Sequence, residues 1–166
     1  MSEAALQPSP QDSGTQDIVV DEVFPHAPEM IWKALTTGEL IGRWLKMALT
    51  GFAPAVGTRF TFQTTPAGAW DGVIQCQVLE AVPNERFAFS WKGGDEGNVG
   101  YGSRLDTVVT FSLSRVAMGT RLRLVHSGFV LPKNETAFKN MGAGWKKVVP
   151  SIGAIAGEQD PSKPLH

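Results

Sequence analysis

The sequence contains one cysteine, Cys76, among its 166 residues. A single cysteine excludes an intrachain disulfide and leaves no cysteine cluster for a structural metal. Long apolar runs are also missing, since no segment approaches the roughly 20 apolar residues that a membrane-spanning helix needs. We therefore expect a cytoplasmic protein that binds no metal or other cofactor and does not insert into a membrane.

An excess of charge of either sign is lacking too. Fifteen Lys and Arg stand against 16 Asp and Glu, and no basic run is present. The sequence therefore offers no electrostatic basis for binding nucleic acid. The three histidines, His26, His126 and His166, lie far apart in the sequence and do not predict a metal site.

Motifs of common catalytic centres are absent as well. There is no nucleophile elbow, no HExxH pattern and no phosphate-binding loop, and the glycine-rich segment 93–102 lacks the spacing and the lysine of a P-loop. Glu22 and Asp106 would serve as acid and base only if both faced inward, and strand alternation places Asp106 opposite the apolar residues. The sequence therefore assigns no catalytic residue.

The apolar residues that are present, 42% of the chain, suffice for the core of one globular domain. Residues 1–16 are polar and predict a disordered leader, and residues 158–166, with two prolines, predict a flexible tail. The domain is expected to span residues 17–157.

Near the start of the domain, β-branched residues predict a strand over 17–24 that ends before Pro25. Apolar residues at helical spacing then predict a helix over 28–35 and a second over 38–45. Thr36 and Glu39 fit a capping box at the start of the second helix.

Period-two alternation follows and predicts strands with one apolar face. The apolar positions are Phe60 and Phe62; Ile74, Cys76 and Val78; Phe87, Phe89 and Trp91; Leu105 to Leu113; and Leu122 to His126. Between Gly93 and Gly102 five of ten residues are glycine, which predicts an irregular loop able to act as a gate. The sheet is expected to be antiparallel, which makes the domain α+β.

The last segment has Asn134 as an expected N-cap and an apolar stripe from Phe138 to Ile152. Pro150 removes an amide from this helix and predicts a kink, or a break that starts a separate turn.

Short motifs occur along the chain in a definite order. They are Phe24-x-x-Ala27-Pro28-x-x-x-Trp32, Glu39-Leu40-x-x-x-Trp44, Gly57-x-x-Phe60, Val82-Pro83-x-x-Arg86, Ser90-Trp91, His126-Ser127-Gly128-Phe129 and Gly144-Trp145. Over about residues 17 to 157 they resemble the START-like (SRPBCC) superfamily, in the subfamily named for homologues of the activator of the heat-shock-protein-90 ATPase. The resemblance implies a helix-grip fold, in which a curved antiparallel sheet wraps around a long C-terminal helix and two short helices follow the first strand.

Gly142 and Gly144 are unusual in a helix because each glycine costs about 1 kcal/mol relative to alanine. If the last helix lies across the sheet, they either let its backbone approach a strand or leave space beside Trp145. A helix that is merely weakened at this point is an equal interpretation.

The resemblance also implies a cavity between the sheet and the last helix. The expected ligand-binding residues are Trp44, Phe60, Phe62, Phe89, Trp91, His126, Met141 and Trp145. Ordinary core packing explains the same aromatic residues, and His126 is either a polar contact for a ligand or a core histidine bonded to backbone.

These observations predict a non-catalytic protein that binds a small hydrophobic or amphipathic ligand, with His126 or Arg59 orienting its polar end. The ligand would enter between loop 93–102, the second helix and the last helix. One alternative is a cyclase-like or hydrolase-like enzyme acting on an aromatic or lipid-like substrate, with His126 as general base. Another is an interaction module that stimulates a partner such as a chaperone ATPase.

Overall fold

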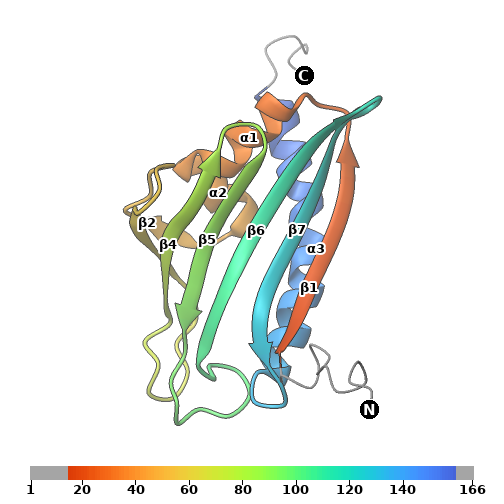
Figure 1. Ribbon diagram of the computed structural model, residues 1–166. Coiled ribbons are helices and arrows are strands. Elements are labelled where there is room, and N and C mark those ends of the chain that lie inside the picture. Colours follow the sequence, from red (N-terminus) through yellow and green to blue (C-terminus); the bar gives the residue numbers. More distant parts are fainter. Residues whose placement is uncertain (1–14, 160–166) are drawn as a thin grey trace, which may run out of the picture.

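Seven antiparallel strands form one curved sheet, and a long helix crosses one of its faces (Figure 1). The computed structural model describes residues 15–159. The strands are β1 (Thr15–Phe24), β2 (Ala48–Thr50), β3 (Arg59–Gln63), β4 (Val73–Val82), β5 (Arg86–Gly93), β6 (Leu105–Val116) and β7 (Gly119–Val130). The helices are α1 (Pro28–Thr36), α2 (Gly38–Leu45) and α3 (Glu135–Glu158). The order β1-β7-β6-β5-β4-β3-β2 confirms the expected α+β architecture.

Alternation along the strands separates a buried inner face from a wetter outer face. On β6, Leu105, Val109 and Phe111 are buried, whereas Asp106 is exposed and pairs with Lys92 of β5 over 3.8 Å. Asp106 is therefore a solvated outer residue, as the alternation predicted.

Helix α3 packs against β1, β7, α1 and α2, which places it across the inner face. At Gly153 the helix backbone lies against β1, because an added Cβ atom would overlap the ring of Phe24. At the C-terminal end of α3, Glu158 forms an ion pair with Arg43 of α2 over 2.7 Å. A glycine at 153 thus lets the helix lie against the first strand.

The predicted capping box at the start of α2 is wrong. The N-cap is Thr37, with no side-chain cap, and the Thr36 hydroxyl donates to the Trp32 carbonyl over 2.7 Å. Thr36 is still the last residue of α1, so its hydroxyl bonds back to the carbonyl four residues earlier.

Helix α3 decides between alternatives that the sequence left open at its two glycines, and it excludes one of the two at Pro150. It runs through Pro150 without the predicted break, and Pro150 and Lys146 are both exposed, so water can reach the carbonyl that the proline leaves unbonded. An added Cβ at Gly142 or Gly144 meets nothing within 4 Å. The two glycines therefore leave space and do not bring the helix backbone to a strand.

The ends of the domain differ slightly from the expected boundaries. Strand β1 begins at Thr15, two residues inside the predicted leader 1–16, and α3 continues to Glu158. The rest of the leader, and all but two residues of the predicted tail 158–166, lie outside the described residues. The short strand β2 was not predicted.

Candidate ligand-binding site

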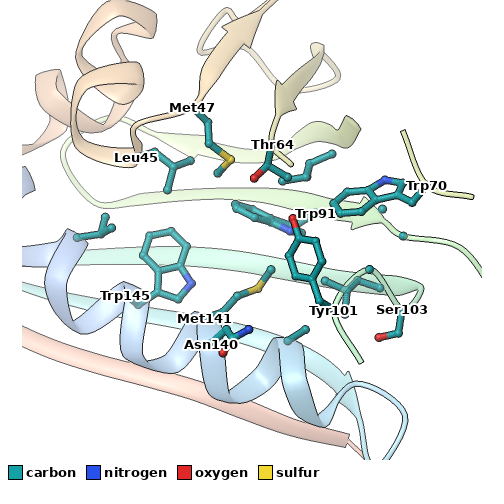
Figure 2. Close-up of a pocket in the computed structure, with 18 residues that line it drawn as sticks. Leu45, Met47, Thr64, Trp70, Trp91, Tyr101, Ser103, Asn140, Met141 and Trp145 are labelled. Atoms are coloured by element: carbon teal, nitrogen blue, oxygen red, sulfur yellow. The ribbon is translucent and has the colours of Figure 1, made fainter. Parts of the chain in front are cut away.

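A pocket of about 220 Å³ lies between the sheet and the first half of α3 (Figure 2). Its floor comes from β4, β5 and β6, and its other walls come from the end of α2, the β3–β4 loop, the β5–β6 loop and α3. The residues that line it are Leu45, Met47, Thr64, Trp70, Ile74, Trp91, Gly93, Gly94, Tyr101, Gly102, Ser103, Leu105, Ala137, Asn140, Met141, Gly144, Trp145 and Val148.

Two indoles in edge-to-face contact form part of the pocket wall. Trp91 from β5 and Trp145 from α3 have ring centroids 6.2 Å apart and are each 3% exposed. Met141 lies one turn before Trp145 on the same face of α3, and Gly144 beside it carries no side chain into the space. This arrangement explains the glycine next to the tryptophan, because a larger residue at 144 would fill the pocket.

No Asp, Glu, His, Lys or Arg is among the residues that line the pocket. Its few polar side chains are hydroxyls, an amide and indole N–H groups. Thr64, Tyr101 and Asn140 lie at partly or fully exposed positions, whereas Ser103 is buried. Apolar walls with a few polar groups are typical of small-molecule sites.

Asn134 holds the Ser103 side of the pocket in place. Its side-chain nitrogen donates to Ser103 Oγ over 3.0 Å and to the Arg104 carbonyl over 2.9 Å. Its side-chain oxygen accepts from the Val130 amide over 2.9 Å. Asn134 occupies the N-cap position as predicted, but its side chain ties β7 to β6 and does not cap the helix.

Two loops enclose the pocket at the end away from α1. The Asn98 side-chain nitrogen in the β5–β6 loop donates to the Ala67 carbonyl in the β3–β4 loop over 2.7 Å. The Tyr101 hydroxyl donates to the Thr65 carbonyl over 2.7 Å, and the rings of Tyr101 and Trp70 lie 6.0 Å apart. The glycine-rich loop is therefore fastened to its neighbour.

His126 is fully buried behind the pocket and does not line it. Its Nδ1 accepts from the Trp145 indole over 3.0 Å, and its Nε2 lies 2.8 Å from the Thr107 hydroxyl. Burial lowers the pKa of His126 from 6.5 to about 3, so the imidazole is neutral near pH 7. The predicted core histidine bonds to side chains and not to backbone.

Of the predicted site residues, Trp91, Met141 and Trp145 line the pocket. The others are buried in the same core but do not line the pocket: Trp44, Phe60, Phe62, Phe89 and His126. Phe60 packs edge-on against Phe52, with ring centroids 5.1 Å apart, in the part of the inner face that is already filled. Arg59, the other expected polar contact, is exposed on the outer side of β3.

Sequence reasoning missed Trp70, Tyr101 and Ser103. Trp70 lines the pocket, and its Nε1 donates to the Val73 carbonyl over 3.0 Å. A bulky aromatic residue in a glycine-rich loop was the available signal, because such a residue needs a surface to pack on.

Within residues 15–159 no group of three or more His, Cys, Asp and Glu side chains is placed to hold a metal ion. The same part of the chain contains no helix that is long and apolar enough to cross a membrane.

Comparison with known proteins finds one family and many related structures. The model of the family described as Activator of Hsp90 ATPase homolog 1-like protein matches residues 25–157. Protein MLL2253 from Mesorhizobium loti is 33% identical, with 87% of this chain and 99% of that chain covered and a TM-score of 0.73. No curated protein matches the chain.

Two more distant structures share the fold. Protein BH1534 from Bacillus halodurans is 22% identical, with 85% of this chain and 96% of that chain covered and a TM-score of 0.66. CalU16 from Micromonospora echinospora is 21% identical, with 87% and 78% covered and a TM-score of 0.64.

Proposed function

This chain belongs to the family of Activator of Hsp90 ATPase homolog 1-like proteins, and from that premise we propose that its pocket binds a small, largely apolar molecule. The observation that carries the proposal is the unfilled space of about 220 Å³ whose lining includes Trp91, Met141 and Trp145. Cores normally pack to high density, so an unfilled space lined by aromatic side chains favours an occupant.

The volume limits the size of the ligand. At the packing density of protein interiors, about 0.74, a pocket of 220 Å³ holds about 160 Å³ of ligand. Two fused aromatic rings with one small substituent have this volume, and a sterol does not fit inside. Because a ligand of this size buries an area similar to that of one tryptophan, we expect dissociation constants in the micromolar range, about 1–100 µM.

Gly144 and Gly142 provide a direct test with a matched control. Both glycines have open space where a Cβ would lie, but only Gly144 lines the pocket. A suitable probe is 2-acetonaphthone, which has two fused aromatic rings and one small substituent. Gly144→Leu is expected to fill the pocket and abolish binding of this probe, whereas Gly142→Leu is expected to keep it. Equal binding by the two variants would show that the ligand lies elsewhere.

The indole N–H signals report the location of binding independently. Each of the five tryptophans gives one such signal in a nitrogen–proton correlation spectrum. Adding 2-acetonaphthone is expected to shift the signals of Trp70, Trp91 and Trp145, which line the pocket, and not that of Trp32, which packs on Phe87 outside it. No shift at any tryptophan would overturn the proposal.

The geometry does not favour the hypothesis of an enzyme with His126 as general base. Both imidazole nitrogens are engaged with Trp145 and Thr107, and the ring lies outside the pocket. A general base has to reach the proton that it removes.

A chaperone-like protein partner is our second proposal, and the family description is the observation that favours it. It predicts that the chain raises the ATPase rate of a heat-shock-protein-90 chaperone and that Gly144→Leu, which only fills the pocket, raises it equally. An unchanged ATPase rate with both proteins would contradict the proposal.

A further inference from the structure

Three tryptophans line the pocket, and their indole N–H groups differ in one respect. Trp70 Nε1 donates to the Val73 carbonyl over 3.0 Å, and Trp145 Nε1 donates to His126 Nδ1 over 3.0 Å. Trp91 Nε1 is buried and has no hydrogen-bond partner. Buried polar groups are nearly always bonded, so an unpartnered donor at a pocket wall calls for an acceptor from outside the chain.

The side chain of Trp91 is held where it is by its neighbours. Its ring lies 5.7 Å from that of Phe62 and 5.3 Å from that of His126, measured between centroids. Phe62 and Phe89 occupy the same inner face of the sheet as phenylalanines, which shows that this face accepts a ring without a donor. An indole at 91 therefore adds an N–H group that packing alone does not require.

A second buried group at the pocket is also free to donate. Ser103 is 2% exposed, and its Oγ accepts from Asn134 Nδ2 over 3.0 Å. Among the described residues the Ser103 hydroxyl proton makes no hydrogen bond. Two buried polar groups of lining residues thus carry hydrogen atoms without an acceptor, which favours a ligand with an acceptor oxygen.

The charges around the pocket decide which acceptor fits. No Lys, Arg or His lines it, and the nearest basic residue along β5, Lys92, is exposed on the outer face and pairs with Asp106. A carboxylate would leave water without meeting a counter-charge, which is strongly unfavourable. A carbonyl oxygen needs only the N–H group.

We propose that the ligand is a neutral aromatic molecule of about two rings whose carbonyl oxygen accepts a hydrogen bond from Trp91 Nε1. Met141 lines the same pocket, and its flexible thioether can move to admit the oxygen. This inference rests on the proposed function, because it names the chemistry that the same pocket selects.

Three probes of nearly equal shape test the proposal: 2-acetonaphthone, 2-ethylnaphthalene and 2-naphthoate. Their dissociation constants can be measured at pH 7 by tryptophan fluorescence. We expect the ketone to bind about five- to tenfold more tightly than the hydrocarbon, the effect of one neutral hydrogen bond. The carboxylate is expected to bind at least tenfold more weakly than the ketone.

Trp91→Phe keeps a ring at this position and removes the N–H group. It is expected to abolish the preference for the ketone over the hydrocarbon. Trp70→Phe is the matched control: it removes an N–H group that is already bonded to Val73, so it weakens both probes by the same factor and keeps the preference. In the wild type, the Trp91 indole proton signal should move downfield with the ketone and not with the hydrocarbon.

The outcomes separate the two proposals. If the ketone and the hydrocarbon bind equally well, or if Trp91→Phe keeps the preference, the pocket binds ligands but Trp91 does not select them, and this inference is wrong. Tight binding of the carboxylate would also overturn it. If none of the three probes binds, the proposed function itself fails.

Discussion

The indole nitrogen of Trp145 on α3 donates to Nδ1 of His126 on β7 over 3.0 Å. This bond fixes the tautomer, because an Nδ1 that accepts carries no proton and Nε2 must carry it. Nε2 then donates to Thr107 Oγ1 over 2.8 Å, and Thr107 donates to the Trp91 carbonyl over 2.8 Å. One chain of buried hydrogen bonds therefore links the indole of Trp145 on α3 to the backbone carbonyl of Trp91 on β5.

Acid should weaken the fold through His126. Burial lowers its pKa to about 3 in the folded state, against 6.5 when exposed, so between these values only the unfolded chain binds the proton. The stabilisation is fully present above pH 6.5 and is lost as pH falls, at about 1.4 kcal/mol per pH unit. From pH 7 to 5.5 the wild type should lose about 1.2 kcal/mol more stability than His126→Gln in urea unfolding. Equal losses in both proteins would contradict this assignment.

The hydrogen bond from Trp145 should be visible in the stability of the protein. Trp145→Phe leaves His126 Nδ1 without a donor, whereas Trp91→Phe makes the same change of ring at an equally buried site where the N–H has no partner. We expect Trp145→Phe to be the more destabilising by about 1–3 kcal/mol, the cost of a buried unsatisfied group. Urea unfolding at pH 7 measures the difference, and similar losses would mean that the bond adds little.

Much of the fold could be predicted because apolar and polar residues recur at regular spacing along its strands and helices. Phe60 and Phe62, or Ile74 and Cys76, mark a buried face by themselves. Strand β2 could not be predicted, because its three residues are at least partly exposed and form a strand only by pairing with β3. Local residue patterns predict elements that bury one face and miss those that depend on a neighbour.

The site could be predicted only in part for a related reason. Periodicity predicted correctly that Trp91, Met141 and Trp145 face the interior. Phe60 and Phe89 face the interior too, but they lie where Phe52 fills the space. Periodicity indicates the side of an element and not the position along it at which another element covers it. Trp70 and Tyr101 come from loops that hydrogen bonds between the loops position, and no spacing rule describes such bonds.

The glycines of α3 should respond to alanine in opposite directions. Gly142→Ala meets open space and gains helix propensity, so it should stabilise the protein by about 0.5–1 kcal/mol. Gly153→Ala places a Cβ against the buried ring of Phe24 and should destabilise it by about 1–3 kcal/mol. Thermal unfolding of the two variants measures both signs. Stabilisation by Gly153→Ala would show that α3 and β1 can move apart at little cost.

Hydrogen bonds fasten the glycine-rich β5–β6 loop to the β3–β4 loop at this end of the pocket. Asn98 Nδ2 bonds to the carbonyls of Ala67 and Gly102, at 2.7 and 3.1 Å, and thereby holds the β5–β6 loop against the β3–β4 loop. Asn98→Ala removes the side-chain amide and should raise the equilibrium constant for local opening of the two loops by about five- to tenfold, the effect of one lost hydrogen bond. Amide hydrogen exchange should then speed up by that factor over residues 64–72 and 94–104 and stay unchanged in β6 and β7.

Tyr101→Phe breaks a more exposed bond and should act more weakly, because water replaces its partner. If Asn98→Ala leaves both loops as protected as in the wild type, the loops are held by the packing of Trp70 against Tyr101, and opening at this end does not depend on Asn98.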